Sequence, residues 1–115
     1  MTDTQYNIML EEVLSEVVPE VWEGVYTGDD VDEYITYTYY AKGTMYADNQ
    51  PTVLLRHTTV TLWVRNGVDH LETRDDLYDA IMSLEGTAPE VTVLTDSEWN
   101  QIVYEFVYPS DVGEE

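Results

Sequence analysis

The sequence has 115 residues and contains no cysteine, one lysine and no long apolar run. Without cysteine, the chain can form no disulfide framework, no thiolate zinc site and no cysteine nucleophile. Because no apolar run approaches eighteen residues, we expect no membrane-spanning helix. The first four residues lack the basic start of a signal peptide, so we expect a protein that is made and kept in a cytoplasm.

Basic residues are also rare in the sequence. Four lysines and arginines stand against twenty-four aspartates and glutamates, which gives a formal net charge of −20. Proteins that bind nucleic acid use clustered cations to displace the counterions of the phosphates. The composition therefore predicts no specific nucleic-acid binding and no attachment to an anionic membrane surface.

The familiar catalytic signatures are also missing. The sequence contains no GxSxG elbow, no HExxH, no P-loop and no GxGxxG. His57 falls within a predicted strand and His70 at the start of a predicted helix, and neither has the convergent partners of a catalytic histidine. We predict no catalytic residue and no cofactor, so the chain is expected not to be an enzyme.

The acidic clusters do not change that interpretation. The densest, at 28–33, lacks the glycine and the closing glutamate of a calcium-binding hand. Asp75 and Asp79 lie one helical turn apart, but such pairs arise by chance when acids are so frequent. We predict no dedicated metal site. A carboxylate-pair hydrolase would need two acids in separate buried environments, and no pair is placed that way.

What is present fits one domain over 1–115, since 43% of the residues are hydrophobic and 12% are aromatic. Apolar residues at three-to-four spacing predict a helix over 4–18, capped by Asp3 or Thr4 and stopped by Pro19. A second helix is predicted to begin around Asp69, which is followed by Glu72, and to end at Gly86.

Alternating β-branched and aromatic residues predict five strands, at 21–26, 33–42, 53–65, 91–96 and 101–108. The order α-β-β-β-α-β-β predicts an α+β fold with mostly antiparallel strands and both helices on one face. The two long strands should form a hairpin whose tip, 43–51, is a mobile loop. We expect the first three or so residues and 111–115 to be flexible.

Strand alternation also predicts a distinctive surface. It places two sets of side chains on one face of neighbouring strands: Thr36, Thr38 and Tyr40, and Thr59, Thr61 and Trp63. If the helices cover the opposite face, this threonine-rich and aromatic face stays open. It is then either a surface for a partner or an ordinary solvated sheet face. Trp22, Tyr26, Val60, Leu62, Ile102, Tyr104 and Phe106 are predicted to be core.

Three segments and their order resemble a known family. They are YADNQ at 46–50, TLWVR at 61–65 and EWNQIVYEF at 98–106. Together with the surrounding helices, they resemble the small tail-terminator or tail-completion proteins of long-tailed phages and prophages, from about residue 5 to residue 108.

The resemblance implies an α+β fold and a structural role in the virion. Members of the family form a ring, typically a hexamer, that ends polymerisation of the tail tube and joins it to the head-tail connector. The partners would be further copies of the chain, the major tail tube protein and the connector protein. DNA passes through the hole, and the protein resides in the host cytoplasm before assembly.

Within this interpretation we predict two contact regions. The subunit face comprises Tyr40, Trp63, Thr59 and Thr61, and a docking contact is formed by Asp48 and Asn49. The charge of −20 has three explanations: a salt-adapted proteome, a surface that repels passing DNA, or a DNA-mimic inhibitor that binds a DNA-processing enzyme. Because the acids are spread from Asp3 to Glu115, the ring is favoured over the mimic.

Overall fold

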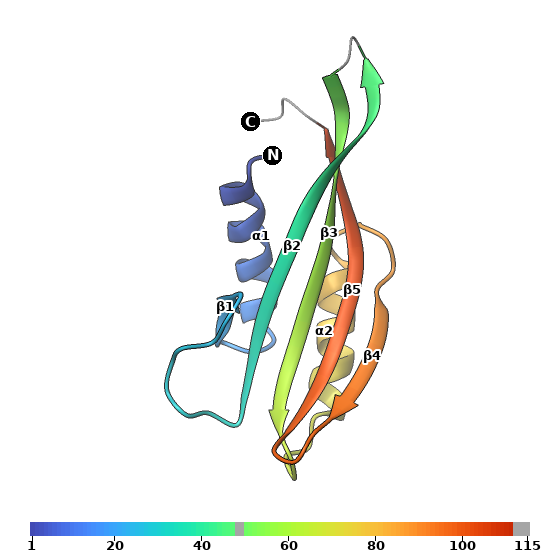
Figure 1. The fold of residues 1–115 in the computed structure, drawn as a ribbon. Helices are drawn as coiled ribbons and strands as arrows, with labels where there is room; N and C mark the ends of the chain where they lie inside the picture. Colours follow the sequence, from blue (N-terminus) through green and yellow to red (C-terminus); the bar gives the residue numbers. More distant parts are fainter. Residues whose placement is uncertain (48–49, 112–115) are drawn as a thin grey trace.

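Two helices and five strands make up the described part of the chain, residues 1–47 and 50–111, in a computed structural model. The order α-β-β-β-α-β-β is as predicted (Figure 1). The elements are α1 (Asp3–Ser15), β1 (Val21–Glu23), β2 (Glu33–Ala47), β3 (Gln50–Arg65), α2 (Leu71–Met82), β4 (Glu90–Thr95) and β5 (Trp99–Asp111).

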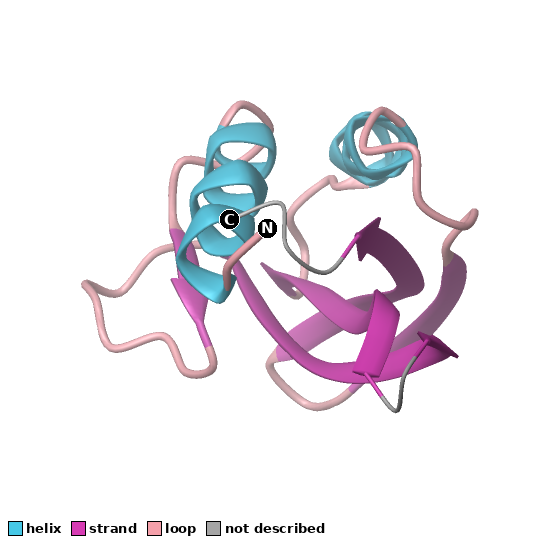
Figure 2. Ribbon diagram, turned by 90° about the horizontal axis from the view of Figure 1, so that it is seen from above, coloured by secondary structure: helices cyan, strands magenta, loops and turns pink. Residues whose placement is uncertain are grey.

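The strands form one mixed sheet in the order β1-β2-β3-β5-β4. Three of the pairings are antiparallel, and β1 pairs with β2 in parallel. Both helices lie on the same side of the sheet, which Figure 2 shows from above. The α+β prediction, with mostly antiparallel strands and two helices on one face, is therefore confirmed.

The first helix begins earlier than predicted. Its cap is Thr2, whose hydroxyl accepts a hydrogen bond from the Gln5 amide at 3.1 Å, while the Gln5 side chain accepts one from the Thr2 amide at 2.8 Å. This reciprocal capping box satisfies two amides that the helix itself leaves unpaired. The prediction of a cap at Asp3 or Thr4 is wrong, because Thr2 is the cap and Asp3 is the first residue of the helix. The flexibility expected of the first three or so residues stays a prediction.

The second helix begins after its predicted cap and ends before its predicted stop. His70 occupies the cap position, and Asp69 instead accepts a hydrogen bond from the Leu71 amide. After Met82 the chain turns through Glu85, whose φ is +64°. Gly86 then passes so close to β5 that an added Cβ would lie 2.6 Å from the Val107 carbonyl oxygen. Only glycine permits this approach.

The core lies between the helices and the sheet. Its buried side chains come from one stripe of each helix, from Val18 and Leu84, and from alternate positions of the three central strands. They are Tyr6, Leu10, Leu14, Val18, Ile35, Tyr37, Val60, Leu62, Val64, Leu77, Ile81, Leu84, Ile102, Tyr104 and Phe106. Five of the predicted core residues are confirmed, but Trp22 and Tyr26 are only partly buried and lie outside this cluster.

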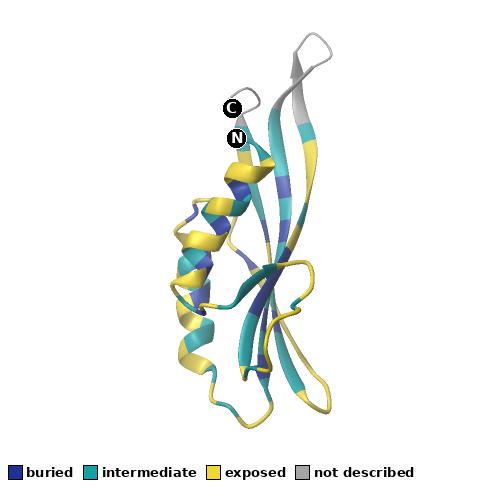
Figure 3. Ribbon diagram, turned by 90° about the vertical axis from the view of Figure 1, so that its left-hand side faces the viewer, coloured by how far each residue is buried: buried dark blue, intermediate teal, exposed yellow. Residues whose placement is uncertain are grey.

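The hairpin of β2 and β3 is longer than predicted. Its register continues from Glu33 opposite Val64 to Ala47 opposite Gln50, so most of the predicted loop at 43–51 is strand. Threonine, tyrosine and valine favour extended backbone in both strands, which explains the extension. The paired strands form an arm that projects past the helices (Figures 1 and 3). Asp48 and Asn49 lie outside the described residues.

The far end of β5 supports the base of this arm. Asp111, predicted to be flexible, belongs to β5 and lies opposite Val53 of β3. The other residues of the predicted flexible end, 112–115, lie outside the described part.

Figure 3 shows that the buried positions of β2 and β3 concentrate where the helices cover them.

Two buried tyrosines lead to a prediction about alkaline pH. The Tyr6 hydroxyl is hydrogen-bonded to the Thr58 hydroxyl at 2.6 Å, and the Tyr104 hydroxyl donates to the Arg74 carbonyl at 3.0 Å. Burial raises the pKa of Tyr6 to about 12 and the pKa of Tyr104 to about 12. In the unfolded chain both ionise near pH ~10, so above that pH the unfolded state binds fewer protons than the folded state.

Stability should therefore be complete below pH ~10 and fall as the pH rises from there through ~12. Thermal unfolding followed by circular dichroism at a series of alkaline pH values measures this. The Tyr104→Phe variant should lose less stability over the same range. A melting temperature that stays constant across the range would contradict the prediction.

Candidate interaction surface

The face of the sheet turned away from the helices is called the open face here. It carries even-numbered side chains of β2 (34–42) and β4 (90–94), and odd-numbered side chains of β3 (57–65) and β5 (99–107), as the strand registers require. Thr36 lies opposite Thr61, and Thr38 lies opposite Thr59. The predicted threonine-rich and aromatic face is thus one continuous surface that neither α1 nor α2 covers.

The predicted contact residues occupy different parts of this face. Tyr40 is 64% exposed and stacks on His57, with ring centres 4.7 Å apart. Trp63 is half-buried and donates a hydrogen bond from its indole nitrogen to Thr36 at 3.0 Å. Thr59 and Thr61 lie between these two aromatic residues and are partly exposed. Tyr40 and Trp63 therefore mark two ends of the face and form no joint contact.

Around Trp63 the structure brings together aromatic rings that the sequence analysis did not connect. This aromatic cluster consists of Trp22, Tyr26, Tyr34, Trp63 and Trp99. Tyr34 is its centre, with ring centres at 4.3 Å from Tyr26, 5.7 Å from Trp63 and 5.3 Å from Trp99. Trp22 joins through Tyr26 because β1 lies beside β2, with Trp22 opposite Thr36.

Arg65 fixes one border of the aromatic cluster. Its guanidinium carbon lies 4.6 Å from the centre of the Trp99 ring, and its nitrogens lie 2.5 Å from an Asp30 oxygen and 3.1 Å from an Asp32 oxygen. The two aspartates belong to the connection between β1 and β2. This connection is therefore held against the end of the sheet by a cation that also contacts an aromatic ring.

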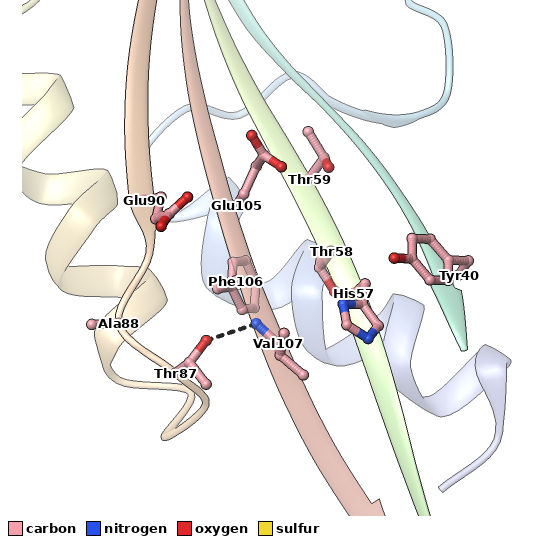
Figure 4. Close-up of a pocket in the computed structure, with 10 residues that line it drawn as sticks. All are labelled: Tyr40, His57, Thr58, Thr59, Thr87, Ala88, Glu90, Glu105, Phe106 and Val107. Atoms are coloured by element: carbon pink, nitrogen blue, oxygen red, sulfur yellow. Dashed lines mark hydrogen bonds between the residues drawn. The ribbon is translucent and has the colours of Figure 1, made fainter. Parts of the chain in front are cut away.

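At the other side of the open face lies a groove with a volume of about 420 Å³. Figure 4 shows its lining, which comes from β2, β3, β5, the first residue of β4 and the segment that leads into it: Tyr40, His57, Thr58, Thr59, Thr87, Ala88, Glu90, Glu105, Phe106 and Val107. The Thr87 hydroxyl accepts a hydrogen bond from the Val107 amide at 2.8 Å and ties that segment to β5.

Two carboxylates face each other in this groove. Glu90 of β4 lies directly opposite Glu105 of β5, and both side chains are exposed. Like charges at directly opposed positions of an antiparallel pair destabilise the pair. In residues 1–47 and 50–111, no three histidine or acidic side chains gather as they would to hold a metal ion. The groove therefore presents an uncompensated negative charge.

The basic residues of the chain are distributed unevenly. Arg56 and Arg65 are engaged in ion pairs. Lys42, the single lysine, is exposed on the open face of β2 and forms no ion pair with any residue that the structure describes. A positive charge thus stands on the arm, apart from the carboxylate pair in the groove.

Comparison with known proteins adds no relative: no protein-family model matches the sequence, and no curated protein matches it significantly. Over the described residues, neither helix has the length and apolar character that crossing a bilayer requires.

Proposed function

We propose that the chain is a phage or prophage structural protein of the tail-terminator or tail-completion kind. Several copies form a ring, a hexamer as is typical of that family, which caps the tail tube and joins it to the head-tail connector. The observation that carries the proposal is the open face, an uncovered threonine-rich and aromatic sheet surface continuous with a projecting two-stranded arm.

The open face has the chemistry of an assembly surface. Aromatic side chains supply large contact areas and dominate the energetics of many interfaces. Tyr40 lies near the arm and Trp63 near the base, with Thr59 and Thr61 between them, so one partner could engage the face along its length. The major tail tube protein and the connector protein would bind at opposite sides of the ring.

The net charge of −20 suits a ring through which DNA passes. Negative side chains around the hole repel phosphates by the same physics that makes basic surfaces bind them. The same charge makes neighbouring subunits repel one another. Assembly should therefore become stronger when ions screen the subunits.

The proposal is tested by the oligomeric state of the purified protein at increasing NaCl and MgCl₂ concentrations. We expect a monomer at low ionic strength and a closed ring in high salt, measured by sedimentation velocity and seen by negative-stain microscopy. A Tyr40→Asp variant should assemble less well at every salt concentration. A strictly monomeric chain under all conditions, or assembly that is tightest at low salt, would contradict the proposal.

A further inference from the structure

Several strand edges of the sheet have no neighbouring strand within the described chain, among them the outer edge of the three-residue β1, and two of them are candidate contacts between copies. The first is the outer edge of β4, the last strand of the sheet, all of whose residues are exposed. The second is the edge of β2 beyond Tyr37, because β1 pairs with β2 only from Ile35 to Tyr37. Figure 1 shows these edges on opposite sides of the sheet. Unpaired strand edges are templates for pairing with another chain.

The hydrogen bonds show which residues of β4 face outward. The Asp96 amide donates to the Trp99 carbonyl at 3.0 Å, in register with the β4–β5 pairing. In an antiparallel pair, directly opposed residues alternate between hydrogen-bonded and non-hydrogen-bonded pairs. The backbone groups of Val91, Val93 and Thr95 therefore point away from β5, toward the free edge.

The same reasoning applies to β2. The Ile35 amide donates to the Glu20 carbonyl at 2.8 Å, and the Tyr37 carbonyl accepts from the Gly24 amide at 2.9 Å. Odd-numbered residues of β2 therefore direct their backbone groups away from β3. Beyond Tyr37 this outward set continues with Tyr39 and Ala41, and no strand of the described chain pairs with them there.

The two edges are complementary in direction and in charge. Because β2 runs antiparallel to β3, β3 to β5 and β5 to β4, β2 and β4 run in opposite directions. Copies placed side by side in the same orientation would therefore bring the two edges together as an antiparallel pair. Their open faces would then join, with the exposed Lys42 on the same face as Glu90 and Glu105.

We propose that residues 90–93 of β4 in one copy pair with residues 39–42 on the outer edge of β2 in the next copy, since β1 already occupies that edge up to Tyr37. Lys42 then lies beside Glu90 of its neighbour, on the same face as Glu105. This inference rests on the proposed function and names the contact through which the ring closes. The contact joins two different edges, so it is heterologous and repeats from copy to copy until the ring is complete.

The registers also give the offset between neighbouring copies. Through β5 and β3, Glu90 aligns with Thr38 of its own β2. Bringing Glu90 beside Lys42 of the next copy thus displaces that copy along the strands by four residues, roughly 13 Å. A constant stagger of this kind is what allows strands to close into a cylinder.

A charge exchange tests the pairing. Lys42→Glu and Glu90→Lys should each lower the association constant of the subunits at least ~10-fold, measured by sedimentation at fixed salt. The double variant has the wild-type net charge, and its association constant should recover to within ~3-fold of wild type. Glu98→Lys carries the same charge change as Glu90→Lys on an exposed turn away from the edge, and should assemble at least as well as wild type.

Backbone and cross-linking variants provide independent readouts. Val93→Pro removes an outward amide and leaves the β4–β5 ladder intact, so it should block assembly of a chain that still melts cooperatively. Because the chain has no cysteine, the variant with both Lys42→Cys and Glu90→Cys should oxidise to a ladder of covalent multimers. The matched variant with Lys42→Cys and Glu98→Cys should give none.

The outcomes separate this inference from the proposed function. Suppose that rings form normally with Val93→Pro and with Lys42→Glu, and that the variant with both Lys42→Cys and Glu90→Cys forms no disulfide between copies. These results would overturn the edge pairing while leaving the ring in place. A wild-type chain that stays monomeric at every salt concentration would overturn both.

Discussion

Raising the NaCl concentration from about 0.05 M to about 1 M should raise the melting temperature of the monomer by roughly 15 °C. Most of the acidic residues behind the net charge of −20 belong to the described part of the chain, which measures 54 × 25 × 23 Å, so many carboxylates lie close together. Two like charges ~10 Å apart repel by about 0.4 kcal/mol in water, and some ten such pairs amount to roughly 4 kcal/mol. Salt at that concentration shortens the screening length from above 10 Å to about 3 Å and removes most of this repulsion.

Thermal unfolding at low protein concentration, followed by circular dichroism, measures this effect apart from assembly. Low concentrations of guanidinium chloride should stabilise the fold because they add ions, whereas equal concentrations of urea should not. A melting temperature that is insensitive to NaCl, or equal responses to the two denaturants, would contradict the role given to the charge.

Replacing Arg56 by alanine should lower the free energy of unfolding by about 3 kcal/mol. The side chain is 2% exposed and reaches from β3 to the start of α1 and the last residues of β5. It donates hydrogen bonds to the Met1 carbonyl and the Ser110 hydroxyl, each at 2.9 Å, and its guanidinium carbon lies 5.2 Å from the centre of the Tyr6 ring. Alanine would lose these bonds and leave a cavity.

Asp3, the ion-pair partner of Arg56, supplies the control. Asp3 lies 3.3 Å from Arg56 but is 72% exposed, so water solvates it when the pair is broken. Asp3→Asn should therefore cost less than about 1 kcal/mol, measured by urea unfolding beside Arg56→Ala. Arg56→Met, which keeps most of the volume, should fall between them. Equal losses for Asp3→Asn and Arg56→Ala would show that the ion pair, and not burial and hydrogen bonding, carries the contribution.

The sequence predicted the element order and the helix-covered face because its periodicities are strong. Alternation in β3 predicted that Val60 and Leu62 are core residues. The same alternation also buries Arg56 and Thr58, which were not predicted to be core because their side chains are polar. Helix ends were less predictable, because Thr2 and Asp3 are both good caps and only the reciprocal bonds with Gln5 decide between neighbours.

The open face was predictable from alternation alone, but the aromatic cluster was not. It depends on the parallel placement of β1 beside β2, which brings Trp22 opposite Thr36, and no local pattern encodes that pairing. The groove likewise depends on β4 pairing with β5 so that Glu90 meets Glu105. The contact roles of Tyr40, Trp63, Thr59 and Thr61 stay predictions, and those of Asp48 and Asn49 concern residues outside the described part.

The projecting hairpin has a hydrodynamic consequence. The radius of gyration of the Cα atoms is 15.3 Å, whereas a compact domain of this length would have one of about 13 Å. An elongated particle experiences more friction than a sphere of equal mass, so a single molecule will elute from a gel-filtration column ahead of globular standards. Its elution volume would thus suggest a larger particle, and light scattering, which reports mass without reference to shape, is the measurement by which its subunits should be counted.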